Sequence, residues 1–310
     1  MNYRQTIAEA WLFTQENKKM IVWYAFIPSI LSTTVGVFYL MYQFYALKSS
    51  VIFENWQESF TVVAIKYIFD TLRDNIDSLV PLIIALVILG LLYFFLPPLT
   101  EGAIIQLIAR KKNGQGVRIR DGVRFGMTSF LPMFEYSLVA RGFNVFVVVG
   151  EMLFVLRNLG LQAFETLSPI FVLIFIVTLI FTLIFIYADY YIVIDNFGIK
   201  ESMAKSASLV VLHWDKSLML SILMVIIALR IILQIVFVLL VPGAIMLLIY
   251  FFAASSIPLG GFIVGGILSI LALILASYLG AIVHVFTSSV WVFTFFELTQ
   301  TSEASPRETA

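Results

Sequence analysis

The chain has 310 residues, of which 61% are apolar and 12% charged, and it contains no cysteine. This leaves too little polar surface for a water-soluble globule, so the composition predicts an integral membrane protein. Nineteen basic and nineteen acidic residues cancel, and no net charge points to a nucleic-acid partner. Without cysteine and with only two histidines, disulfides, thiolate nucleophiles and multi-histidine metal cages are excluded, and we expect no cofactor.

A short amphipathic cassette occurs three times, beginning at Ile7, Ile119 and Ile199. Each copy continues with an acid, a small residue and an apolar residue, and a small or hydroxyl residue closes the next helical turn. The three sets are Glu9, Ala10, Trp11 and Thr14; Asp121, Gly122, Val123 and Gly126; and Glu201, Ser202, Met203 and Ser206. Two long apolar segments follow each copy. The repeat therefore predicts three helical hairpins, each preceded by a short amphipathic helix.

Six segments are apolar and long enough to cross the hydrocarbon core, which takes about 20 residues per helix. They cover residues 21–46, 79–108, 133–156, 169–194, 217–241 and 262–296. The predicted fold is an all-α, polytopic membrane helical bundle of six transmembrane helices, forming a single domain over residues 1–298. Residues 242–261 are ambiguous, because Pro and Gly residues flank the apolar piece 244–254. This region is re-entrant, interfacial, or part of a seventh span that would place the C-terminus outside.

Basic residues predict the orientation, because they are retained on the cytoplasmic side. With six spans, thirteen lie in inside segments: Arg4, Lys18, Lys19, Arg110, Lys111, Lys112, Arg118, Arg120, Arg124, Lys200, Lys205, Lys216 and Arg307. Only four lie in outside segments: Lys48, Lys66, Arg73 and Arg157. Both termini and all three cassettes are therefore expected in the cytoplasm, and the N-terminal segment, which shows no cleavage site, is expected to stay in the mature protein.

The outside segment 47–80 and the C-terminal tail are the predicted extramembrane pieces. Phe53, Trp56, Phe60, Val63 and Tyr67 recur at helical spacing, which predicts a helix lying flat on the outer membrane surface. We interpret it as a membrane-anchored cap, with a ligand-binding lid as the alternative. Residues 299–310 have no apolar periodicity and are expected to be disordered.

Charged residues inside the predicted spans are candidate functional groups, because placing a charge in hydrocarbon is costly. Counted at about 1.5 Å per residue, Glu101, Arg141 and Asp189 lie roughly 10–13 Å from the cytoplasmic ends of their spans. We predict that Arg141 pairs with Asp189 or Glu101. A second cluster nearer the outer face contains Glu151, Arg230 and Gln234, in which we predict that Glu151 pairs with Arg230.

These charge pairs have two interpretations. An ion pair can fix which helices pack together, or it can line the path of a solute. We favour the packing role, because the sequence indicates no continuous polar path. His284 would extend a proton relay if it faced Arg230 or Asp189, although a single histidine more often makes one hydrogen bond in a core. Pro97-Pro98 is expected to kink its span, and the alternative is a broken helix that builds a substrate site.

A basic loop follows the second span, and its cations are Arg110, Lys111, Lys112, Arg118, Arg120 and Arg124. Six cations at headgroup level attract anionic lipid, so we expect lipid contact here. The sequence Asn113-Gly114-Gln115-Gly116 lacks the lysine and hydroxyl residue of a phosphate loop, which argues against nucleotide binding. No nucleophile elbow or zinc-protease helix occurs either, so we expect no enzyme activity.

Two stretches carry a family resemblance. The first runs from Gly102-Ala103-Ile104-Ile105 through Arg110 and Gly114 to Ile119-Arg120-Asp121-Gly122, and the second from Asp195-Asn196 to Ile199-Lys200-Glu201-Ser202 and Ser206. In these the chain resembles a family of uncharacterised bacterial six-helix membrane proteins, in the superfamily of the membrane domain joined to some glycerophosphodiester phosphodiesterases. The resemblance implies six helices with amphipathic cytoplasmic elbows, in the bacterial inner membrane. It implies no catalytic residues.

The function predicted from the sequence is that of a non-catalytic scaffold, or of the membrane subunit of a larger complex, in contact with anionic lipid. The expected partners are membrane lipids and a protein in the membrane, and no nucleic acid. The alternative is a transporter or channel for a small solute or lipid. It would use Glu101, Arg141 and Asp189, with Arg230 and Glu151 as a second gate.

Overall fold

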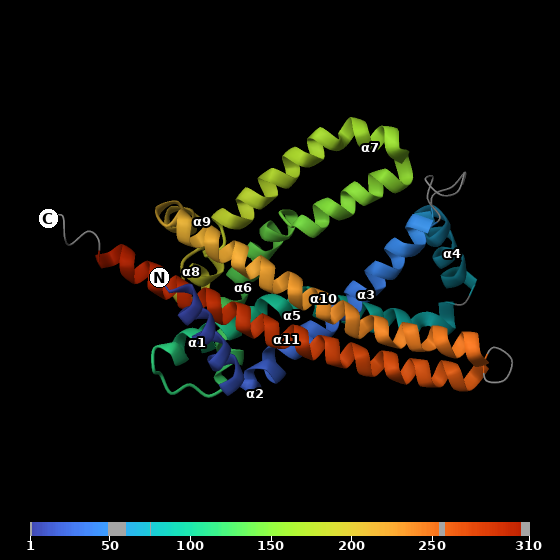
Figure 1. The fold of residues 1–310 in the computed structure, drawn as a ribbon, viewed down its shortest axis with the longest axis horizontal. Coiled ribbons are helices and arrows are strands. Elements are labelled where there is room, and N and C mark those ends of the chain that lie inside the picture. Colours follow the sequence, from blue (N-terminus) through green and yellow to red (C-terminus); the bar gives the residue numbers. More distant parts are fainter. Residues whose placement is uncertain (1, 49–59, 75, 254–257, 305–310) are drawn as a thin grey trace.

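The computed structural model describes residues 2–48, 60–74, 76–253 and 258–304, and Figure 1 shows their arrangement. Over these ranges the regular structure is entirely helical, with no strand. Five stretches are long and apolar enough to cross a membrane: Lys18–Leu47, Leu79–Lys112, Asp121–Ile194, Trp214–Leu233 and Gly265–Gln300. The prediction of an all-helical integral membrane protein is confirmed at this level.

The three cassettes are helical. The first forms α1 (Tyr3–Glu16), the second opens α6 (Asp121–Gly142) and the third forms α9 (Ile199–Leu212). The short α2 (Lys18–Met20) and a π-helical turn, η1 (Ile21–Ala25), join α1 to the first long helix.

Apolar helices follow each cassette, but their lengths differ from one copy to the next. After α1 these are α3 (Phe26–Lys48) and α5 (Ile76–Lys112), with the shorter α4 (Phe60–Asp74) between them. After the second cassette, α6 continues to Gly142 and is followed by α7 (Val145–Ile184) and the seven-residue α8 (Ala188–Ile194). The predicted spans 133–156 and 169–194 are therefore interrupted, at residues 143–144 and 185–187. After α9 come α10 (Trp214–Ala253) and α11 (Pro258–Ala304). Helix α7 turns back on itself at Gly160, whose φ of +83° interrupts the helical backbone (Figure 1).

In α10 and α11 the structure differs from two predictions made from the sequence. Pro242-Gly243 does not end α10, so residues 244–253 continue one helix and form no separate re-entrant, interfacial or seventh segment; residues 254–257 lie outside the described part of the chain. Prolines are tolerated in membrane helices because neighbouring groups satisfy the freed carbonyl. Helix α11 runs to Ala304, so residues 299–304 are helical where disorder was expected, and 305–310 lie outside the described residues.

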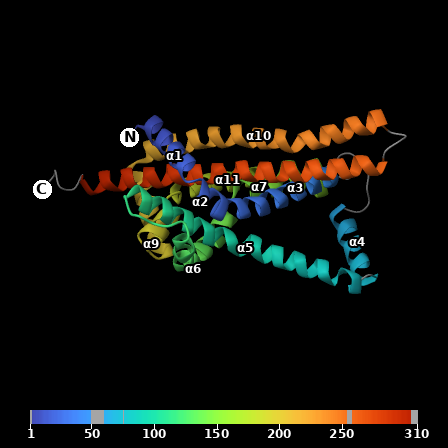
Figure 2. The ribbon, with the colours of Figure 1, turned by 90° about the horizontal axis from the view of Figure 1, so that it is seen from below.

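The outer segment 47–80 is described in part. Phe53 and Trp56 lie outside the described residues, whereas α4 carries Val63 and Tyr67, which are 37% and 72% exposed. Figure 2 shows α4 crossing the direction of the long helices, at the end of the molecule away from both termini. This position suits a helix lying along a membrane surface.

The buried core lies near the two termini. It contains the second half of α5, the whole of α8 and the last third of α11, with Ile104, Ile192 and Val290 among its least exposed side chains. Towards the opposite end α5 diverges from α10 and α11 (Figure 2), and its apolar side chains become exposed, as at Leu82 and Leu86. Such continuous exposed apolar surface is typical of helices that contact lipid.

The small residues of the cassettes are buried where helices meet. Ala10 and Ser202 are fully buried, and Gly122 packs so tightly that an added Cβ would lie 2.7 Å from the Tyr24 hydroxyl. At Gly126 an added Cβ would lie 2.3 Å from a backbone carbonyl of α5. Small residues let helix backbones approach closely, so the repeated pattern reflects repeated helix packing.

Candidate functional site

A cavity of about 880 Å³ lies between α3, α5, α6, α8 and α11. Two acids and one histidine line it: Glu101 on α5, Asp189 on α8 and His284 on α11. Most other polar lining groups are hydroxyls, from Ser29, Ser32, Thr33, Tyr93, Thr100, Tyr136 and Ser137, together with the side-chain amide of Asn144. Cavities of this size bind small molecules in many proteins.

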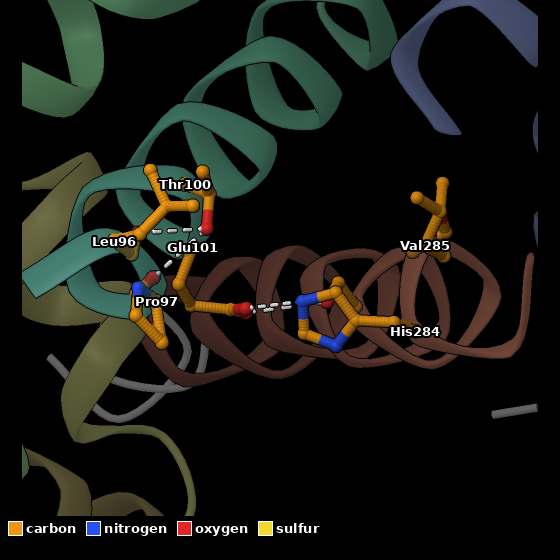
Figure 3. Close-up of polar contacts among 8 residues, drawn as sticks. Leu96, Pro97, Thr100, Glu101, His284 and Val285 are labelled. Carbon is orange, nitrogen blue, oxygen red and sulfur yellow. Dashed lines mark hydrogen bonds and ion pairs between the residues drawn. The ribbon is translucent and has the colours of Figure 1, made fainter. Parts of the chain in front are cut away.

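Glu101 and His284 form the closest charged contact in this cavity among the described residues. The Nε2 atom of His284 lies 2.7 Å from Oε2 of Glu101, and Figure 3 shows the two side chains pointing at each other between α5 and α11. The Ser288 hydroxyl donates to Oε1 of the same carboxylate at 3.2 Å. The His284 side chain is nevertheless 44% exposed, because its ring borders the cavity.

Asp189 lies in the first turn of α8, beyond a break in the helix at residues 185–187. The break is held by Ser206 of the third cassette, whose hydroxyl donates to the Ile184 carbonyl at 2.8 Å and accepts from the Tyr187 amide at 3.1 Å. Gln106 donates to the Val193 carbonyl and thereby ties α8 to α5. Among the described side chains, none donates a hydrogen bond to Asp189, so its carboxylate is an open acceptor in the cavity.

The three titratable groups come from three different copies of the repeat. Glu101, Asp189 and His284 each lie in the second apolar segment that follows a cassette, on α5, α8 and α11 respectively. Each copy therefore contributes one group to the same cavity.

Pro97 and Pro98 lie one turn before the cavity carboxylate, and α5 continues through both. The Thr100 hydroxyl donates to the carbonyls of Leu96 and Pro97, at 3.0 and 3.1 Å (Figure 3). The backbone here is thus bonded locally and not broken, as expected for a proline kink.

The remaining predicted site residues do not join this cavity among the described side chains. Arg141 follows cavity residue Ala140 on α6, but its side chain lies outside the described part, so its predicted pairing stays untested. Glu151 and Arg230 are both exposed, and no ion pair joins them. The side chain of Gln234 also lies outside the described part.

The six cations of the basic loop fall into two groups. Three are used to join helices: Lys112 pairs with Glu9 at 2.8 Å, Lys111 bonds Asn17, and Arg110 lies 4.3 Å above the ring of Phe125. Arg118, Arg120 and Arg124 have exposed side chains, and these three remain candidates for lipid contact.

Glu9 lies outside the candidate spans, so its titration is that of a surface group. The hydrogen bond from Lys112 is the largest influence on its pKa, followed by the one from Gln5, and together they lower the pKa below its ordinary value. The ion pair between Glu9 and Lys112 joins α1 to the C-terminal end of α5.

No group of three or more histidine, aspartate or glutamate side chains in the described ranges is placed to hold a metal ion. The lining of the cavity instead suits a ligand held by hydrogen bonds and by charge.

No protein-family model, curated protein or solved structure matches this chain. The resemblance drawn from the sequence motifs stays a prediction, and the function has to be argued from the cavity and the surface.

Proposed function

We propose that this protein is a six-span membrane transporter or channel that binds a small polar solute in the cavity around Glu101, Asp189 and His284. The observation that carries the proposal is the cavity itself, about 880 Å³ in volume, with titratable groups from three helices. A pair that served packing alone would be sealed, whereas His284 is 44% exposed. We therefore prefer the transporter to the scaffold predicted from the sequence.

Several features support six spans. The reversal at Gly160 divides the long stretch Asp121–Ile194 into two arms, and the second, residues 161–184, is long enough to cross the bilayer. The first arm consists of α6 and residues 145–159, with a break between them at residues 143–144. The exposed Trp23 in η1 and Tyr45 on α3 are 22 positions apart, which is about 33 Å along a helix and close to the thickness of the hydrocarbon core. Tryptophan and tyrosine favour the two membrane interfaces.

Contact with anionic lipid is a second proposed property, and it favours a cytoplasmic position for the cassettes. The exposed Arg118, Arg120 and Arg124 lie beside the first turns of α6. Each cation near an anionic membrane surface contributes about 1 kcal/mol before screening by salt. A scaffold or membrane subunit would use the same contacts, but it would carry no solute.

The absence of cysteine allows the topology to be tested with single cysteines. In intact cells, a membrane-impermeant maleimide should label Asp70→Cys on α4. It should label Arg120→Cys and Lys200→Cys only after permeabilisation. Labelling of positions 120 and 200 from opposite sides contradicts the six-span topology.

Transport is tested in proteoliposomes with a panel of radiolabelled cations, neutral solutes and carboxylates. We expect uptake of at least one class, and loss of that uptake in Glu101→Gln. Glu135→Gln is the matched control, because Glu135 lies exposed on α6 outside the cavity lining. Equal uptake by protein-free liposomes for every solute would overturn the proposal and favour the scaffold.

A further inference from the structure

We infer that the solute is an organic cation, whose ammonium group binds Asp189 beside the Glu101–His284 pair. This inference rests on the proposed function and specifies its substrate class. The charge of the cavity, the one carboxylate without a donor and the chemistry of the remaining lining all favour it.

With both carboxylates ionised, the charge of the described lining is negative in either state of the histidine. Two carboxylates, Glu101 and Asp189, face at most one cation, His284, and the described lining contains no lysine or arginine. When His284 is protonated its charge is balanced by Glu101, at 2.7 Å, and Asp189 remains. When His284 is neutral, both carboxylates remain. An anionic solute would be repelled in both cases.

The carboxylates of Glu101 and Asp189 differ in the number of hydrogen bonds that they accept. Both oxygens of Glu101 accept hydrogen bonds, from His284 and Ser288. Asp189 accepts none from the described side chains, and it is half-buried beside the cavity. A carboxylate removed from bulk water is costly unless a cation or donor meets it, so Asp189 is where a positive ligand gains most.

The rest of the lining suits an organic ammonium better than a metal ion. Hydroxyl oxygens such as those of Ser29, Ser32 and Thr33 can solvate a positive group, and the aromatic residues Tyr93 and Tyr136 also belong to the lining. A volume of about 880 Å³ corresponds to roughly thirty waters, at about 30 Å³ each, far more than a bare ion occupies. The space therefore accommodates carbon groups attached to the ammonium.

The test uses three probes of the same shape and different charge: choline, 3,3-dimethyl-1-butanol and 3,3-dimethylbutanoate. The readout is the rate at which a membrane-impermeant maleimide alkylates Ser32→Cys, a cavity position, in lipid nanodiscs that expose both membrane faces. Ser289→Cys is the control for reactivity, because Ser289 is fully buried in α11.

We expect choline to slow alkylation of Ser32→Cys by a factor of 1 + [L]/Kd, about tenfold at ten times its Kd. The neutral and anionic probes should have no effect at the same concentrations. Asp189→Asn should abolish the protection, measured against the unprotected rate of the same variant, whereas Glu135→Gln should keep it. If Asp189→Asn fails to give a monodisperse protein, Glu101→Gln provides a second carboxylate variant.

The outcomes separate the two proposals. If Ser32→Cys reacts no faster than Ser289→Cys, the cavity does not admit water and the proposed function itself is overturned. If Ser32→Cys reacts but choline protects no better than its neutral isostere, only the cation inference is overturned. Protection by 3,3-dimethylbutanoate also overturns it, and it would assign the cavity to anions.

Discussion

Replacing Gly126 with alanine tests whether the cassettes set the packing that builds the cavity. Gly126 lies where α6 crosses α5, and an added Cβ would lie 2.3 Å from the Leu99 carbonyl oxygen and 3.3 Å from the Cβ of Ala103. A carbon and a carbonyl oxygen approach to about 3.3 Å, so the two helices must separate by about 1 Å. A backbone carbonyl within a helix cannot rotate away as a side chain can.

Overpacking of this kind costs about 1–3 kcal/mol. At about 2–4 °C per kcal/mol, Gly126→Ala should lower the apparent melting temperature by about 2–12 °C. The same substitution at Gly90, which lies on α5 with no atom within 4 Å of an added Cβ, should leave stability unchanged or raise it slightly. Intrinsic fluorescence during heating in detergent measures both. If Gly126→Ala melts at or above the temperature of Gly90→Ala, the close α5–α6 contact does not support the fold.

Two further predictions concern the cassette acids. The pKa of Glu9 is lowered from its ordinary 4.5, so its pair with Lys112 stabilises the fold above that pH and the effect is lost as pH falls through the lowered pKa. For an exposed pair this stabilisation is about 0.2–1 kcal/mol. Melting curves recorded between pH 3 and 7 should therefore show a pH-dependent loss of this size in the unmodified protein and not in Glu9→Gln. Asp121 accepts from the Arg118 amide at 3.0 Å, so Asp121→Ala should cost about 0.5–1.5 kcal/mol in thermal melting, and Asp121→Asn, which keeps the acceptor, should cost less.

The sequence was sufficient for the class of protein and for the presence of long apolar helices, because both depend on local composition. A run of about 20 apolar residues has few stable conformations other than a helix in hydrocarbon. The cassettes were recognisable because close packing demands small residues at fixed spacing, as at Ala10, Gly122 and Ser202. Counting residues from the cytoplasmic ends of the spans gave Glu101 and Asp189 similar depths in the membrane, and both line one cavity.

Estimating membrane depth by counting residues from the end of a span failed where a helix extends beyond the membrane. Helix α11 has 47 residues, about 70 Å, so counting from its end gives no membrane depth for His284. The sequence therefore did not pair His284 with Glu101. The predicted pair of Glu151 and Arg230 failed for another reason: equal depth does not ensure that two side chains lie on facing sides of their helices, and both are exposed.

The repeat and the cavity are connected by their geometry. Each copy of the cassette brings its own second apolar segment towards the same buried core, so groups at similar positions along these segments, Glu101, Asp189 and His284, meet between α5, α8 and α11. A packing role alone would be served by apolar residues at these three positions, and often with more stability than by ionisable ones. Ionisable groups from all three copies, bordering open volume, are better explained by a ligand that binds where the copies converge.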